Sequence, residues 1–145
     1  MSYSFYGWET ALVPPITDEY AGIHNPRDLY DALTHIWCEY TCTPRMREKW
    51  NEDVKMLGAC SITSFLAQDI FGGKVYGILQ SGGNYHCFNV VGDCVFDLTS
   101  EMFHDALDYS ECTEQFREEH FKREEKRLRY EYLKEELLKS TRTIL

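Results

Sequence analysis

Residues 58–73 read GACSITSFLAQDIFGG, a run that carries no charge before Asp69. An apolar stretch of this length, closed by Gly72-Gly73, predicts a buried helix with a glycine C-cap. Cys60 falls in the first turn of that helix. There the helix dipole and the unpaired backbone N–H groups favour an anion, so a thiolate is stabilised and the pKa of the thiol is lowered. The stretch therefore predicts both a central helix and a candidate nucleophile.

A hairpin is predicted downstream, over residues 85–98 (YHCFNVVGDCVFDL). Gly92-Asp93 suits its tight turn, because glycine and aspartate tolerate positive φ. Counting outward from that turn, side-chain alternation places His86 and Asp97 on one face, with a Cα separation of about 7–8 Å. A carboxylate–imidazole hydrogen bond is within reach at that separation. A one-residue slip of the register would instead send the two side chains to opposite faces.

Cys60, His86 and Asp97 thus form an ordered trio of thiol, imidazole and carboxylate. In a cysteine enzyme the thiol is the nucleophile, the imidazole is its base, and the carboxylate orients the base. Each residue alone also has a structural interpretation, as a small core thiol, a satisfied polar strand residue and a turn or cap carboxylate. The agreement of helix dipole, strand face and chain order favours the catalytic interpretation.

Other segments complete an α+β fold. Asn25 as N-cap and Pro26 at the first helical position predict a helix that ends near Glu39. Residues 74–80 predict a strand, and the turn 81–84 joins it to the hairpin. Three sequential strands with short links form an antiparallel meander, on which the central helix is expected to pack.

The last third of the chain is predicted to be mostly helical. Thr99 or Ser100 caps a short helix through Phe103 and Leu107, and residues 113–139 form a long charged helix with an irregular apolar stripe. Its expected ion pairs are Glu118–Lys122, Glu119–Arg123 and Glu125–Arg129. The stripe either docks on its own domain or contacts a partner, which leaves both a monomer and a homodimer open.

The composition fits one domain over residues 1–145, with an N-terminal arm (1–24), an α+β core (25–110) and a charged C-terminal helix (111–145). A chain of 145 residues with 43% hydrophobic content supports one core. Its net charge of −9 argues against a nucleic-acid partner, because phosphate binding needs a basic footprint.

No segment resembles a signal peptide or a membrane span, so we expect a cytoplasmic protein with no membrane partner. The six cysteines are then expected to stay reduced. Cys38 and Cys42 have the spacing of a zinc-binding pair but lack a second close Cys or His pair, so no metal is expected. No organic cofactor is implied either.

Four short motifs occur in order along the chain. They are GAC at 58–60, QD at 68–69 before GG at 72–73, GNYHCFN at 83–89, and DLTSEMF at 97–103. In these motifs the chain resembles the YunG-like family of small uncharacterised bacterial proteins, over about residues 28–104 and again at RYEYL, 129–133. The resemblance implies a papain-like (NlpC- or transglutaminase-like) domain with Cys60, His86 and Asp97 as the triad, and no established substrate.

The chain departs from the pattern of that family at the candidate site. Ala59 stands where the family tends to place glutamine, so a side-chain oxyanion donor is missing there. Gln68 is too distant to replace it, since eight residues of helix rise about 12 Å. Asn89 points away from His86 by strand alternation and is a poor alternative to Asp97.

The sequence therefore predicts a cysteine hydrolase or acyltransferase that acts on an amide, peptide or thioester bond of an unidentified small-molecule or peptide substrate. The alternative is a non-catalytic papain-like binding or interaction module, made credible by Ala59. Gly82-Gly83, in the turn before the hairpin, either line a substrate groove or only satisfy the geometry of the turn.

Overall fold

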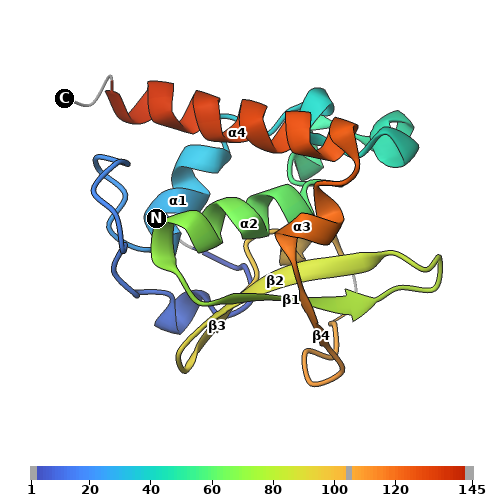
Figure 1. The fold of residues 1–145 in the computed structure, drawn as a ribbon, viewed down its shortest axis with the longest axis horizontal. Coiled ribbons are helices and arrows are strands. Elements are labelled where there is room, and N and C mark those ends of the chain that lie inside the picture. Colours follow the sequence, from blue (N-terminus) through green and yellow to red (C-terminus); the bar gives the residue numbers. More distant parts are fainter. Residues whose placement is uncertain (1–2, 104–105, 143–145) are drawn as a thin grey trace.

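The computed structural model describes residues 3–103 and 106–142 (Figure 1). Within these residues the strands are β1 (Lys74–Leu79), β2 (Tyr85–Val91), β3 (Cys94–Phe96) and β4 (Thr113–Gln115). The α-helices are α1 (Pro26–Leu33), α2 (Cys60–Phe71), α3 (Arg117–His120) and α4 (Glu124–Arg142). The strands form one antiparallel sheet in the order β3-β2-β1-β4. In Figure 1, α2 lies next to this sheet and α4 lies farther out on the same side, so the fold is α+β as predicted.

The register of the predicted hairpin is confirmed. Val91 pairs with Cys94 and Val90 with Val95, and the turn between them places Gly92 at a φ of +60°. The meander of β1, β2 and β3 is confirmed as well. What the sequence did not predict is β4, which pairs with the other edge of β1.

Helix α2 has the bounds that its sequence predicts. Nine of its 12 residues are buried, and the N–H of Gly72 closes the helix by donating to the carbonyl of Gln68 over 2.8 Å. Gly73 follows at a φ of +75°, where a Cβ atom would lie 2.3 Å from the carbonyl oxygen of Val90. Glycine at this position therefore lets the chain turn directly from α2 into the sheet.

Helix α1 is shorter than predicted. Asn25 caps it as expected, accepting from the backbone N–H of Asp28 over 3.0 Å, but it ends at Leu33 rather than near Glu39. The Thr34 hydroxyl donates to the carbonyl of Asp31 over 2.6 Å, and side-chain bonds of this kind compete with helix propagation. Beyond the helix, the indole N–H of Trp37 bonds to the buried Thr63 hydroxyl of α2 over 3.0 Å.

The single helix predicted over 113–139 is wrong in its first third. Residues 113–115 form β4, because they pair with the free edge of β1, and α3 and α4 are separated by a break at 121–123. The Phe121 ring at that break packs against Phe65 of α2, with ring centroids 5.5 Å apart. Of the short helix expected through Phe103 and Leu107, the described residues form only a 3-10 turn over Ser100–Met102, and residues 104–105 lie outside the described ranges.

The break changes the ion pairs of this region. Glu119 pairs with Lys122 over 2.9 Å instead of with Arg123, because residues 119 and 123 no longer share one helix. The predicted pair of Glu125 and Arg129 does form, over 2.8 Å.

Helix α4 docks on its own domain, which is one of the two alternatives that the sequence left open. Leu133 and Leu137 are fully buried in the hydrophobic core that α2 dominates. Arg129, also buried, donates to the carbonyl of Thr41 over 2.9 Å. No helix in the described ranges is both long and apolar enough to cross a membrane. A homodimer through α4 stays a prediction.

Leu133→Ala is expected to lower the free energy of unfolding by about 2–5 kcal/mol, because it removes a fully buried side chain and leaves a cavity. Leu128→Ala on the same helix is the matched control. That side chain is 42% exposed, so its loss should change stability by no more than about 0.5 kcal/mol. Equal effects of the two substitutions in urea unfolding would contradict the docking of α4.

The N-terminal arm reaches the end of the hairpin and helps to position Asp97. The backbone N–H of Asp97 donates to the carbonyl of Tyr6 over 3.0 Å, in an isolated antiparallel bridge. Phe5 is fully buried, and Gly7 passes so close to β3 that a Cβ atom there would lie 2.0 Å from the carbonyl oxygen of Val95. The arm thus fixes the backbone of the residue that the sequence selects as the carboxylate of the trio.

Candidate active site

The three candidate residues come from three different elements. Cys60 is the first residue of α2, His86 is the second residue of β2, and Asp97 directly follows β3. His86 and Asp97 are 2% and 1% exposed, whereas Cys60 is half-buried. The trio therefore places a reachable thiol beside a buried pair of imidazole and carboxylate.

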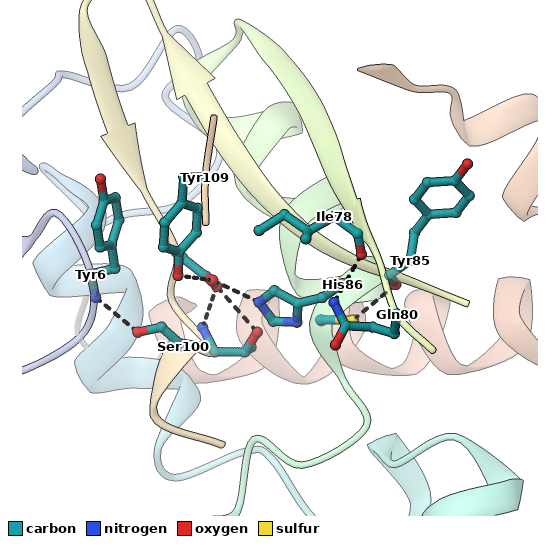
Figure 2. A network of polar contacts seen from close by, with 10 residues as sticks. Tyr6, Ile78, Gln80, Tyr85, His86, Ser100 and Tyr109 are labelled. Atoms are coloured by element: carbon teal, nitrogen blue, oxygen red, sulfur yellow. Dashed lines mark hydrogen bonds and ion pairs between the residues drawn. The ribbon is translucent and has the colours of Figure 1, made fainter. Parts of the chain in front are cut away.

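His86 and Asp97 make the contact that the register predicts. Nε2 of His86 lies 2.6 Å from Oδ2 of Asp97 (Figure 2). The other carboxylate oxygen accepts from the backbone N–H of Thr99 over 3.2 Å and from its hydroxyl over 3.4 Å. The Tyr109 hydroxyl donates to Oδ2 over 2.7 Å. Donors to both of its oxygens thereby hold the Asp97 carboxylate in place.

Aromatic rings enclose this pair. Tyr109 stacks on Tyr6 of the arm, with ring centroids 3.8 Å apart, and both residues lie to the left of His86 in Figure 2. The Phe103 ring meets the His86 ring edge-on, with centroids 4.7 Å apart. Sequence analysis did not select these rings, because they come from irregular segments whose position no periodicity encodes. They exclude water from the bond between imidazole and carboxylate and so strengthen it.

The second ring nitrogen of His86 has no hydrogen-bond partner. Nδ1 is the one buried side-chain nitrogen or oxygen atom without a partner in the described parts of the chain. Because Nε2 is engaged by Asp97, the electrostatic interaction of the ring with the Cys60 thiol runs through Nδ1. A buried nitrogen without a hydrogen-bond partner costs free energy of folding, so a histidine with a purely structural role is expected to have both nitrogens paired. A free nitrogen that faces a thiol is instead typical of a functional histidine.

Electrostatics favour a thiolate on Cys60. A hydrogen bond with the Cys87 thiol and the interaction with His86 lower the pKa of Cys60 well below its ordinary value, against the opposing effect of burial. Burial alone lowers the pKa of His86, but the hydrogen bond with Asp97, the interaction with Cys60 and the charges of both outweigh it and raise the pKa to about 10. Both shifts favour a thiolate on Cys60 and an imidazolium on His86 at neutral pH.

Cys87 is a contributor that sequence analysis missed. Its hydrogen bond to Cys60, together with burial, raises the pKa of Cys87 well above its ordinary value. Cys87 is therefore the thiol that keeps its proton and donates to the Cys60 thiolate. All six cysteines are free.

Cys60 and His86 open onto a cleft of about 610 Å³. Its walls include the turn of residues 81–84. Gly82 and Gly83 therefore line the cleft and do more than satisfy the geometry of the turn. A volume of this size suits a small molecule or a short peptide segment.

Asn89 and Gln68, which were considered as alternatives to Asp97 and to the missing oxyanion donor, both lie away from the site, as the sequence predicts. The amide of Asn89 donates to the carbonyl of Ser64 over 2.9 Å, away from His86. Gln68 bonds to the carbonyl of Gly73 over 3.1 Å and does not line the cleft. Ala59 is the N-cap of α2 and provides no side-chain cap. In residues 3–103 and 106–142, no cluster of three or more His, Cys, Asp or Glu side chains is arranged to hold a metal ion.

Comparison with known proteins identifies the family. The model of the YunG protein family matches residues 25–142. The uncharacterised protein YunG of Bacillus subtilis (strain 168) is 33% identical over 61 residues, which are 42% of this chain and 52% of that protein. The match thus spans about half the length of this relative. No solved structure matches the chain. The chain belongs to the YunG family.

Proposed function

We propose that the protein is a cysteine hydrolase or acyltransferase in which Cys60 is the nucleophile, His86 the general acid and base, and Asp97 the group that orients the imidazole. One observation carries this proposal. The His86 ring is fixed by Asp97 at Nε2, while its other nitrogen is buried, unpaired and electrostatically linked to the thiol of Cys60. A structural histidine would be expected to have both nitrogens satisfied.

The chemistry follows from the charges of the pair. The Cys60 thiolate attacks the carbonyl carbon of an amide, peptide or thioester bond, and an S–C bond forms while the carbonyl oxygen becomes an oxyanion. Collapse of this intermediate breaks the bond to the leaving group, which takes the proton from Nδ1 of His86. Water or another acceptor then attacks the thioester, and His86 removes the proton from that acceptor. Thiolate and imidazolium are thereby restored.

Backbone groups provide the stabilisation that a glutamine at position 59 would have supplied. The first N–H groups of an α-helix have no intrahelical partner, and the N-cap Ala59 brings no side chain to satisfy them. They point toward the end of α2 at which the oxyanion forms beside Cys60. Catalysis in this site would therefore rely on the helix terminus more than on a side-chain donor.

A papain-like architecture belongs to the same proposal. It is supported by a helix that begins at the nucleophile and packs on an antiparallel sheet whose second strand carries the histidine. The rival function is a binding module that kept this arrangement without turnover, and Ala59 is the observation that favours it. A cytoplasmic location, where thiols stay reduced, is the setting in which we propose that Cys60 works.

An activated ester separates the two functions. With p-nitrophenyl acetate, an enzyme should form an acetyl thioester at Cys60, seen by peptide mass spectrometry, and release p-nitrophenol beyond one equivalent per chain as the thioester hydrolyses. Cys112→Ser, which removes an exposed thiol outside the cleft, should behave as the parent protein does. Acetylation of Cys60 without release beyond one equivalent would favour the binding module.

A further inference from the structure

The cleft beside Cys60 carries a charge opposite to that of the whole chain. Its walls include the cationic side chains of Arg45, Arg123 and Lys126, in a protein whose net charge is −9. Among the described residues, none of these three forms an ion pair with a carboxylate, although the chain holds 24 acidic and only 15 basic residues. Three cations without a carboxylate partner around one cleft favour the binding of an anionic ligand there.

The other charged groups of the cleft are neutralised within the protein, the Cys60 thiolate by the imidazolium of His86 among them. Arg129 is paired with Glu125 over 2.8 Å. Glu119, the one carboxylate among the described lining residues, is paired with Lys122 over 2.9 Å. Arg45, Arg123 and Lys126 therefore set the potential of the cleft.

Lys126 is held in its position by a chain of hydrogen bonds. Its ammonium group lies 2.9 Å from Nδ1 of His120, and Nε2 of His120 lies 2.8 Å from the side-chain oxygen of Gln115. Burial and the charge of Lys126 lower the pKa of His120 to about 4, so at neutral pH the ring is uncharged and its Nδ1 accepts a hydrogen bond from the ammonium group of Lys126. This leaves the remaining N–H donors of Lys126 for a ligand.

We infer that the cleft selects an anionic substrate, one that carries a carboxylate or phosphate group close to the acyl carbon attacked by Cys60. The inference rests on the proposed function, since it names the substrate class of that site. Arg123 comes from the break between α3 and α4, and Lys126 comes from the first turn of α4. Arg45 is distant from both in the sequence and lies in the 3-10 helix Pro44–Lys49, before α2. Anion selectivity is thus a property of the assembled cleft and of no single segment.

Two reagents of nearly equal size test this charge preference directly. Iodoacetate is anionic and iodoacetamide is neutral, and both alkylate thiolates. The ratio of their rates at Cys60 is compared with the ratio at Cys112, an exposed thiol of the same molecule outside the cleft. We expect the ratio at Cys60 to be the larger and to fall toward that of Cys112 in 1 M salt, because salt of about that concentration shortens the Debye length to about 3 Å.

Variants separate the cleft cations from the imidazolium of His86. Arg45→Gln, Arg123→Gln and Lys126→Gln should each lower the ratio at Cys60 about twofold, and the triple variant about eightfold. Lys139→Gln removes the same charge near the far end of α4, about 20 Å of helix from Lys126, and should leave the ratio unchanged. A ratio at Cys60 equal to that at Cys112, or one that the triple variant does not change, would overturn the inference.

This test measures a ratio of two rates at the same thiol and does not depend on how fast either rate is. If Cys60 proved to be an ordinary thiol, the proposed function would fail, but the ratio would still report the charge preference of the cleft.

Protection against iodoacetamide identifies the anionic group. Slower alkylation of Cys60 with succinate in excess indicates a carboxylate, and slower alkylation with inorganic phosphate indicates a phosphate. Protection by neither anion would count against the inference.

Discussion

Cys60→Ser is expected to abolish turnover of p-nitrophenyl acetate, with a loss of at least about 10⁴-fold in rate and with the fold retained. The serine hydroxyl is similar in size to the thiol, but the imidazolium and the helix dipole cannot make it an anion at neutral pH, as they do the thiol. The rate is measured by release of p-nitrophenol, and the fold by circular dichroism and thermal unfolding.

The matched control for this variant is Cys112→Ser, which makes the same change at an exposed thiol. It should retain the full rate. Turnover that survives in Cys60→Ser would show that the reaction does not use this thiol, and the assignment of the nucleophile would be wrong.

Asp97→Asn is expected to lower turnover by about 10²–10⁴-fold while the variant stays folded. Asparagine keeps the shape of the side chain, but it removes the negative charge that raises the pKa of His86. A lower pKa of His86 means a less stable imidazolium, and the thiolate that it stabilises becomes less stable in turn. The pKa of Cys60, read from the pH dependence of its alkylation, should therefore rise by about 1–3 units.

Asp93→Asn is the control, because it makes the same substitution on the exposed hairpin turn, four residues earlier in the chain. Neither turnover nor the pKa of Cys60 should change in that variant. If Asp97→Asn behaved in the same way, Asp97 would be a structural cap and not the group that orients the imidazole.

The elements that position the trio were predictable because their signals are local. The bounds of α2 follow from a run that has no charge before Asp69 and ends in two glycines, and the register of the hairpin follows from one turn. From that turn, side-chain alternation alone places His86 and Asp97 on one face. The contact of 2.6 Å between them is therefore a consequence of a two-residue turn that the sequence displays.

The parts that were not predicted depend on contacts between distant segments. Residues 113–115 resemble the start of a charged helix, and only the free edge of β1 makes them a strand. Tyr109 reaches Asp97 from an irregular loop, and the thiol of Cys87, which helps to lower the pKa of Cys60, comes from β2 and not from α2. The cationic cleft is the same kind of feature, since Glu119 and Arg123 read as an ion pair until the helix breaks between them.

The pH dependence of Cys60 alkylation by iodoacetamide tests the central claim most directly, because it reports whether the thiol is ionised by its surroundings. Rates at Cys60 and at Cys112 are followed in the same samples by peptide mass spectrometry. The account predicts a midpoint for Cys60 well below the ordinary thiol value of about 8.5, with a rate already near its plateau at neutral pH, and an ordinary midpoint for Cys112. A midpoint for Cys60 at or above that of Cys112 would contradict the assignment of Cys60, His86 and Asp97 as a catalytic unit.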